Sequence, residues 1–352
     1  MRKKFLALML SALMIGATAC GAKTEKKDEV SNNMKSNEEV TGKVRIYTSM
    51  YEDIIDNMKP ALKKKFPKCE VEFFQGGTGT LQTKVAGEIE AGKLACDIIM
   101  VAEPSYAYEL KEKKILHKFE IENKDKLAFE YDKEGYWYPV RISNMVLAYN
   151  PEKTKKEDIA QSFKEFAEKE TLAGKISMSD PLKSGTALAA VSGLKDKYNE
   201  EYFTKLANKK VAVEAGSVAL AKLETGEMDE LMILEESVLK KREEEKSPLE
   251  VIYPKDGTIV VPSPIMVVDE KLTENKNTKA AEAISKWFLS EEGQKYIVKG
   301  WMHSVLKDFS EIPYDAIKTS EITGNSIKVK WEQLVKDRDG LRKMFTDTIG
   351  KK

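Results

Sequence analysis

An apolar strand followed by a glycine-rich loop and an amphipathic helix is the feature that most constrains this fold. Val71 to Phe74 form the apolar run, Gln75 to Thr80 read Gln-Gly-Gly-Thr-Gly-Thr, and Leu81, Val85 and Ile89 recur at four-residue spacing. The free N–H groups and the dipole of a first helical turn favour an anion, which glycines allow to approach closely. The stretch is therefore a candidate anion site. It could also be an ordinary strand-to-helix turn, because it matches neither of the usual phosphate-binding glycine signatures.

Strands and helices alternate on both sides of this stretch. Val44 to Thr48 and Asp97 to Val101 are apolar runs of strand length, and the second resembles a strand that is covered on both faces. This order predicts an α/β fold with a doubly wound, mostly parallel sheet. In such sheets ligands bind beyond the carboxyl ends of the strands. We therefore expect Ser49, Met50 and Glu103 to lie beside the glycine-rich loop.

A second set of strands and helices follows an aromatic segment. Tyr136 to Arg141 lead into an apolar strand from Met145 to Asn150, which we interpret as a crossover to another lobe. The later apolar runs of strand length lie at 175–178, 211–213, 231–234, 251–253 and 259–261. The last two runs are expected to return to the first lobe.

These patterns give a domain prediction. We expect lobe one to contain residues 43–143 and 258–352, and lobe two to contain residues 144–257. The chain ends in helical patterns that include 280–289, 291–298 and 327–335, and we expect these C-terminal helices to pack on lobe one.

The first twenty residues have the pattern of a bacterial lipoprotein signal peptide. Basic residues precede an apolar run from Phe5 to Ile15, and small residues then lead to Cys20. We expect cleavage before Cys20 and lipidation of its thiol, although a secreted protein cut near Ala19 is the alternative. Residues 21–42 are almost without apolar side chains and are expected to form a flexible tether.

Charge and residue composition exclude several functions. The chain has 58 Lys and Arg against 58 Asp and Glu, so composition gives no argument for binding nucleic acid. It has two histidines, and neither a Ser/His/Asp set nor a zinc-binding spacing is present. The expected protein is therefore not an enzyme and has no metal or other cofactor. Cys69 and Cys96 precede strands that should lie about 9–10 Å apart, beyond disulfide reach, so we expect free thiols.

The order of the motifs resembles a known family. The segments VRIYTSM, GGTGT, DIIMVAEP, YWYPVR, GKISMSDPLKSGTA and YPKDGTIVVPSPIMVV occur in this order between residues 43 and 305. Together they resemble type II extracellular solute-binding proteins of bacterial ABC importers, in the branch that binds ferric iron, phosphonates and sugar phosphates. The resemblance implies two α/β lobes that close on a solute held between them.

The resemblance also implies that strand-end loops of both lobes face the solute. The candidate ligand-binding residues are Ser49, Met50, Gly77, Thr78, Gly79, Thr80, Glu103, Arg141, Ser184, Gly185, Thr186, Ser217, Glu235 and Glu236. Helix-start N–H groups, hydroxyls and a bidentate arginine suit a phosphate or phosphonate group. The structural alternatives are a salt bridge for Arg141, a plain helix cap at Ser184 and a solvated helix start for both Glu235 and Glu236.

Ferric binders of this branch carry two adjacent tyrosines where this chain has Glu235 and Glu236. Phenolate ligands for iron are therefore not evident. We predict a monomeric, lipid-anchored receptor on the outer face of the cell membrane, or in a diderm periplasm. It should capture an anionic small solute, preferably an organophosphate or phosphonate, and deliver it to ABC permease subunits. A ferric-iron receptor and an enzyme on the same fold stay open as alternatives.

Overall fold

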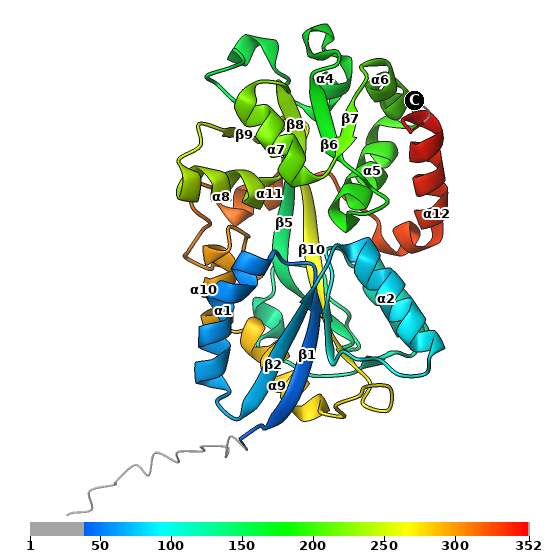
Figure 1. Cartoon of the computed structure of the whole chain (residues 1–352), viewed down its shortest axis with the longest axis vertical. Helices are drawn as coiled ribbons and strands as arrows, with labels where there is room; N and C mark the ends of the chain where they lie inside the picture. Colours follow the sequence, from blue (N-terminus) through cyan, green and yellow to red (C-terminus); the bar gives the residue numbers. More distant parts are fainter. Residues whose placement is uncertain (1–38, 351–352) are drawn as a thin grey trace, which may run out of the picture. The chain divides into compact units, whose positions relative to one another are not determined.

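The computed structural model describes residues 39–350, which build one ten-stranded sheet (Figure 1). The strand order is β2-β1-β3-β10-β5-β8-β6-β7, with β4 beside β10 and β9 beside β5. The strands are β1 (Gly42–Thr48), β2 (Cys69–Gln75), β3 (Ile98–Met100), β4 (Leu116–His117), β5 (Trp137–Tyr149), β6 (Ile176–Ser179), β7 (Ala212–Glu214), β8 (Glu230–Leu234), β9 (Glu250–Ile252) and β10 (Ile259–Val268).

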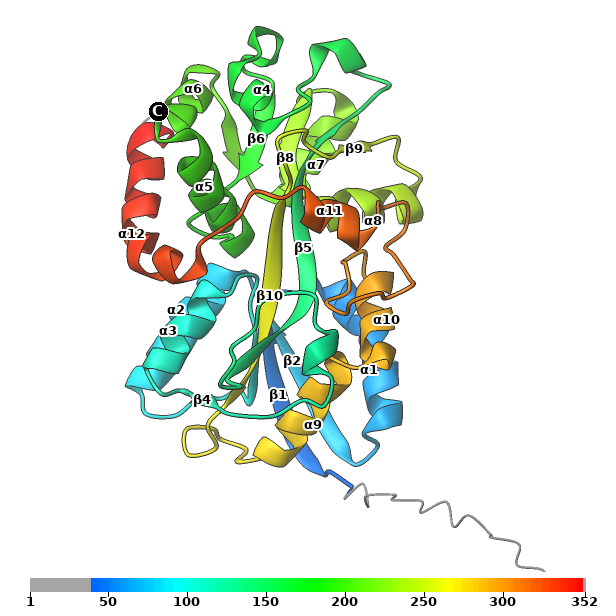
Figure 2. The same ribbon diagram turned by 180° about the vertical axis from the view of Figure 1, so that it is seen from behind.

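Helices cover both faces of this sheet (Figures 1 and 2). The helices are α1 (Glu52–Lys65), α2 (Thr78–Glu90), α3 (Ser105–Glu112), α4 (Phe163–Glu168), α5 (Gly185–Tyr198), α6 (Glu201–Asn208), α7 (Gly216–Thr225), α8 (Glu235–Glu245), α9 (Thr278–Phe288), α10 (Glu291–Lys299), α11 (Thr319–Gly324) and α12 (Trp331–Thr348). Three short 3-10 helices lie at Lys124–Lys126, Lys156–Asp158 and Glu170–Leu172. The prediction of a two-lobed α/β fold is confirmed.

Lobe one contains the parallel strands β2, β1 and β3. Successive residues of a strand point to opposite faces, and Ile98 and Ile99 of β3 accordingly belong to two different apolar clusters. The first cluster contains α1, α9 and α10, and the second contains α2 and α3. The buried helix face predicted at Leu81 and Val85 lies in the second cluster.

Lobe two repeats this arrangement with the parallel strands β8, β6 and β7. Met232 of β8 packs with α4, α5 and α6, whereas its neighbour Ile233 packs with α7 and α8 on the opposite face. Both lobes therefore have their helices in two layers, which leaves the carboxyl ends of the parallel strands free to carry a site.

Strands β5 and β10 run through both lobes and pair with each other in antiparallel orientation (Figure 1). The sequence predicts two segments, 136–141 and 145–150, but the structure has one continuous strand of 13 residues, all buried. The pairing shifts register between Ser263 and Pro264, where Ser263 faces Arg141 and Pro264 faces Pro139. This shift is a β-bulge next to Arg141, and bulges reorient side chains near functional sites. Because β5 and β10 belong to both lobes, the lobe boundaries stay a prediction.

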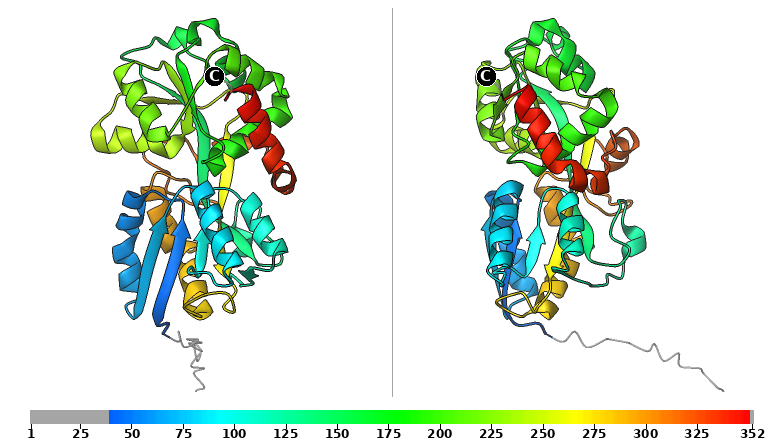
Figure 3. Two further views of the ribbon diagram at one scale, coloured as in Figure 1. Left: turned by 45° about the vertical axis from the view of Figure 1, so that its right-hand side comes forward. Right: turned by 90° about the vertical axis from the view of Figure 1, so that its right-hand side faces the viewer.

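The C-terminal helices differ from our expectation. Helices α9 and α10 pack on lobe one, whereas α12 lies along α5 and α6 of lobe two and also contacts α3 of lobe one (Figures 2 and 3). Trp331, Leu334 and Phe345 of α12 belong to the lobe-two cluster. Helix α12 therefore contacts both lobes and buries its apolar face in lobe two, which its amphipathic pattern alone does not specify.

The structure bears on the N-terminal and cysteine predictions only in part. The signal peptide, Cys20 and residues 21–38 of the tether lie outside the described residues. Within residues 39–350 no helix is long and apolar enough to cross a membrane. Cys69 and Cys96 are both buried and unpaired there, and β1 separates the strands β2 and β3 that they begin or precede.

Candidate functional site

A cavity of about 380 Å³ lies between the two lobes. Its lining includes the residues that precede the first turns of five helices: Tyr51 before α1, Gly77 before α2, Ser184 before α5, Ala215 before α7 and Leu234 before α8. Each helix start contributes unsatisfied N–H groups and partial positive charge. The first turns of α2, α5 and α7 contain no acidic residue that would offset this charge. The part of the cavity beside these three helix starts is therefore suited to an anion.

Arg141 adds a full positive charge to this cavity. Its side chain projects from β5 and the residue is only 4% exposed. One terminal nitrogen donates to Ser49 Oγ at 3.0 Å and the other lies 3.1 Å from Met302 Sδ, while Nε has no partner. Among the described residues no carboxylate forms a salt bridge with it, so the structural alternative considered above is not observed. Burial lowers the pKa of Arg141, which the charge of Glu236 partly offsets.

Glu236 contributes a carboxyl group to the same cavity as Arg141. It lies in the first turn of α8, is 3% exposed and accepts a hydrogen bond from Ser143 Oγ at 3.0 Å. Burial raises its pKa to about 7, against the opposing effects of Arg141 and Ser143. The group is therefore partly protonated at neutral pH and can donate to a ligand oxygen or accept from a hydroxyl. A solvated helix-start residue, the alternative for this position, is not what the structure shows.

The lobes contact each other on both sides of the cavity. On one side the N–H of Gly79 donates to the carbonyl of Lys183 at 3.4 Å. On the other side Tyr51 and Ser237 have hydroxyls 3.3 Å apart. A Cβ atom on Gly185 would lie 3.0 Å from Cγ of Glu103 in the other lobe. These contacts describe a closed arrangement in which the glycines let the two lobes approach.

Eight of the predicted residues line the cavity. They are Ser49, Gly77, Thr78, Arg141, Ser184, Gly185, Thr186 and Glu236. Thr78 Oγ1 accepts a hydrogen bond from the N–H of Ala102, which orients it at the start of α2. Ser184 caps α5 by accepting from the N–H of Ala187 at 3.2 Å. The cap predicted as an alternative therefore exists, and the same residue also faces the cavity.

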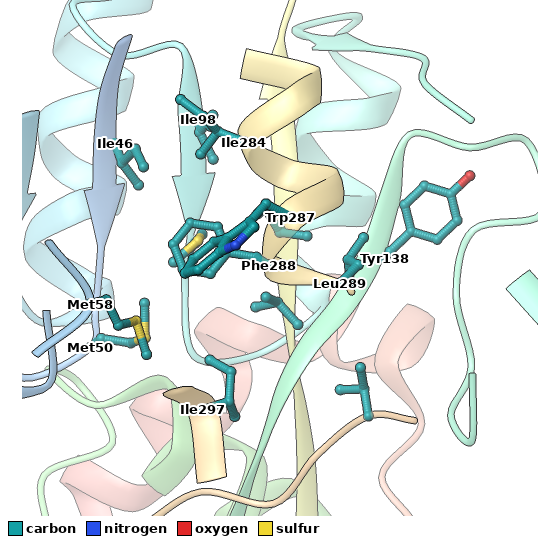
Figure 4. Close-up of a cluster of buried hydrophobic side chains, with 14 of the residues drawn as sticks. Ile46, Met50, Met58, Ile98, Tyr138, Ile284, Trp287, Phe288, Leu289 and Ile297 are labelled. Carbon is teal, nitrogen blue, oxygen red and sulfur yellow. The ribbon is translucent and has the colours of Figure 1, made fainter. Parts of the chain in front are cut away.

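Met50 and Glu235 point away from the cavity. Met50 is fully buried in the lobe-one cluster, beside Met58 (Figure 4). Glu235 accepts from Asn144 at 2.9 Å and lies 3.0 Å from Nε2 of the buried His303. The expectation that Met50 and Glu235 face the solute is corrected, because tertiary partners that are distant in sequence hold both side chains elsewhere.

Four further predicted residues also lie outside the lining. Glu103 is fully buried and accepts from the N–H of Ser105 at 2.6 Å. Gly79 and Thr80 line a separate depression beside α12, and Ser217 lines another on α7. The first turn of a helix points its residues in several directions, so a run of candidates at one helix start cannot all face the same ligand.

Sequence reasoning missed eight polar residues of the cavity, which are Tyr51, Gln75, Ser143, Ser179, Asp180, Lys183, Glu214 and Ser237. Ser143 lies two residues after Arg141 and therefore on the same face of β5. Asp180 and Glu214 stand at or just beyond the carboxyl ends of β6 and β7. Two rules could have predicted Ser143, Asp180 and Glu214: side chains alternate between the faces of a strand, and ligands bind beyond the carboxyl ends of parallel strands. No group of three or more His, Cys, Asp and Glu within residues 39–350 could hold a metal ion.

The sequence matches a known family. Residues 57–305, more than two thirds of the chain, match the family described as bacterial extracellular solute-binding protein. No curated individual protein matches the chain. The match confirms the resemblance inferred from the ordered motifs.

Solved structures with this fold cover nearly the whole chain. Iron-bound HitA from Pseudomonas aeruginosa has a TM-score of 0.73 at 20% identity, over 86% of this chain and 98% of its own. AfuA from Actinobacillus pleuropneumoniae, with fructose-6-phosphate bound, has a TM-score of 0.75 at 20% identity, over 88% and 99%. A substrate-binding protein of an ABC transporter from Agrobacterium tumefaciens has a TM-score of 0.77 at 17% identity, over 89% and 96%. At these identities the likeness establishes the fold.

Proposed function

Because this chain belongs to the bacterial extracellular solute-binding proteins, a non-catalytic family that serves ABC importers, we propose that its own solute is an organic phosphate or phosphonate. The observation that carries this proposal is Arg141, a buried guanidinium in the cavity that has, within residues 39–350, no partner for its Nε and no carboxylate in a salt bridge. A buried charge is costly unless it is paired. A ligand anion would supply the missing partner.

The rest of the lining supports a phosphoryl group. Hydroxyls of Ser49, Thr78 and Thr186 and the helix starts of α2 and α5 come from both lobes. A phosphoryl group has enough acceptor oxygens to use an arginine and several N–H or O–H donors together. A solute that touches both lobes favours the closed arrangement, because closure is a population shift driven by differential binding.

The remainder of the solute would face carboxylates. Glu236 and Glu214 line the lobe-two side of the cavity, and Oε2 of Glu214 is buried without a partner. Carboxylate oxygens accept hydrogen bonds from hydroxyls or amines. A hydroxylated phosphate, such as a sugar phosphate, or an aminophosphonate combines both requirements.

We further propose that the protein is monomeric and is anchored by a lipid on Cys20 to the outer face of the cell membrane, or in a diderm periplasm. The basic, apolar and small-residue order of positions 1–20 supports this proposal. The polar composition of residues 21–42 is consistent with a tether between the lipid and the folded unit.

Iron is the competing solute. HitA holds iron in the same fold, and Tyr51 places one phenol in the cavity of this chain. Tyr51 is, however, the single tyrosine among the lining residues that the structure describes. A ferric site here would need carboxylates and an added anion. The phosphate proposal needs no such addition, and we favour it for that reason.

A thermal-shift panel followed by calorimetric titration tests the proposal. The panel contains fructose 6-phosphate, glycerol 3-phosphate, aminoethylphosphonate, inorganic phosphate and ferric citrate. A compound at a hundredfold excess over its dissociation constant should stabilise the protein by about 2.7 kcal/mol. We expect a shift with at least one organic phosphorus compound. Arg141→Gln should then weaken its binding at least tenfold, as roughly expected for losing a charged hydrogen-bond partner.

Arg45→Gln is the matched control. It also removes one positive charge, but Arg45 pairs with Glu72 away from the cavity. It should leave affinity unchanged. Equal weakening by both substitutions would indicate a general charge effect and refute the role of Arg141. A shift with ferric citrate alone, with a tyrosinate charge-transfer band in visible light, would favour the iron receptor.

A further inference from the structure

Helix α12 is anchored in lobe two by its apolar face. Trp331, Leu334 and Phe345 belong to the same buried cluster as α5 and α6. Phe345 packs edge to face against Phe203 of α6, with ring centroids 6.3 Å apart. Exposing these apolar side chains to water would cost free energy, so α12 should move with lobe two when the lobes separate.

Two arginines of α12 reach the other lobe. Arg338 forms an ion pair with Glu109 of α3 and donates to Ser105 Oγ at 2.9 Å. Arg342 lies 3.4 Å from Oε1 of Gln82 on α2. The Arg338 and Glu109 side chains are 12% and 23% exposed, so their ion pair is largely shielded from solvent.

Helix α3, which carries the partners of Arg338, is packed into the core of lobe one. Ala107 and Leu110 of α3 are fully buried in the cluster that contains α2 and β3. Tyr108 of α3 packs against this cluster and also against the lobe-two cluster that contains α12. The contact of α3 with α12 therefore joins two bodies that closure brings together.

A series of contacts joins the contact between α3 and α12 to the cavity. Ser105, which accepts from Arg338, donates its own N–H to Glu103 Oε2. Glu103 in turn lies against Gly185 at the start of α5, where the lobes meet. Neither Arg338 nor Arg342 lines the cavity. Their influence on a solute must therefore act through the position of the lobes.

We propose that α12 is a strap across the two lobes and that Arg338 is its positioning residue, which raises the population of the closed state and thereby the affinity for the solute. The apparent dissociation constant equals the intrinsic one divided by the fraction of competent molecules. Loss of Arg338 should therefore weaken solute binding without removing any contact to the solute. Coupling between distant positions is typically worth a factor of about 5 to 150.

The test uses the full-length, ligand-free chain, so it does not depend on the identity of the solute. Hydrogen exchange is measured by mass spectrometry for peptides covering 76–82 and 180–186, which contain the interlobe hydrogen bond from Gly79 to Lys183. Arg338→Gln is compared with Lys343→Gln, a substitution in the same helix at a side chain that is 77% exposed. Small-angle scattering on the same samples reports the separation of the lobes.

We expect Arg338→Gln to speed exchange in these two segments at least fivefold and to increase the radius of gyration, with unchanged exchange in β1 and β8. Lys343→Gln should match the wild type, and Arg338→Lys, which keeps the charge, should fall between the two. Unchanged exchange in Arg338→Gln would overturn the proposal. So would equal acceleration in the core strands, because Arg338 would then stabilise the fold and not closure. A failure of the phosphate panel with a positive exchange result would reject the proposed solute and leave the strap intact.

Discussion

Replacing Glu236 by glutamine should stabilise the protein above pH 7 and have little effect near pH 5. Glu236 is buried beside the cavity, and burial raises its pKa from the ordinary 4.5 to about 7. Below pH 4.5 the carboxyl is protonated in both the folded and the unfolded chain. Between pH 4.5 and about 7 only the unfolded chain releases the proton, so the free energy of unfolding falls as the pH rises.

The size of this loss follows from the two pKa values. At about 1.4 kcal/mol for each pH unit between them, ionisable Glu236 should cost about 3 kcal/mol above pH 7 and less than about 1 kcal/mol at pH 5. Glutamine has the same shape and keeps an oxygen that can accept from Ser143. The variant should therefore recover most of this loss in alkaline solution.

Urea denaturation followed by tryptophan fluorescence at pH 5, 7 and 8.5 measures the effect. The midpoint of Glu236→Gln should rise by roughly 1 M relative to the wild type at pH 8.5 and hardly at all at pH 5. Glu245→Gln is the control, because Glu245 lies on the same helix but its side chain is 55% exposed. A gain of equal size at all three pH values would refute the reasoning, since it would show that the effect is not ionisation.

Three further substitutions test the packing described above. Gly185→Ala would place a Cβ atom 3.0 Å from Glu103 Cγ, so it should weaken binding of the best panel compound at least fivefold by calorimetry, with an unchanged melting temperature in the free protein. Gly293→Ala would place a Cβ atom 2.1 Å from the carbonyl oxygen of Trp287, and urea denaturation should show a loss of at least about 1–3 kcal/mol. Phe203→Ala should cost about 3–5 kcal/mol in the same assay, because Phe203 is fully buried in lobe two.

Each of these predictions has a result that contradicts it. Unaltered solute affinity in Gly185→Ala would mean that the lobes do not need this close approach. Wild-type stability in Gly293→Ala would mean that the start of α10 can shift without cost. A loss below about 1 kcal/mol for Phe203→Ala would show that the lobe-two cluster repacks around the missing ring.

The positions of the strands and of the helix starts could be predicted from sequence, because local patterns specify them. The apolar run at 71–74 and the spacing of Leu81, Val85 and Ile89 placed β2 and α2 within a few residues of their observed bounds. Ser184 was correctly placed at the start of α5. Since strand ends of parallel sheets share one edge, the cavity also followed from the strand order.

The direction of individual side chains could not be predicted in the same way. Glu235 and Glu236 are adjacent in one helical turn, yet Glu235 meets His303 and Glu236 meets the cavity. His303 comes from a segment almost seventy residues later, and nothing near Glu235 in the sequence announces this contact. The surface that buries α12 could not be predicted either, because an apolar stripe on a helix does not identify the surface against which it packs.

Strands β5 and β10 pair with each other where they pass from one lobe to the other, so these two of the connections between the lobes form one hydrogen-bonded ribbon. A movement of the lobes should therefore include torsion that is spread along this ribbon. Pro139 and Pro264 face each other at the bulge and have no N–H to donate, so the ribbon is least cross-linked there. Arg141 stands two residues beyond Pro139, and twisting of the ribbon therefore turns the charged group of the cavity together with the lobes.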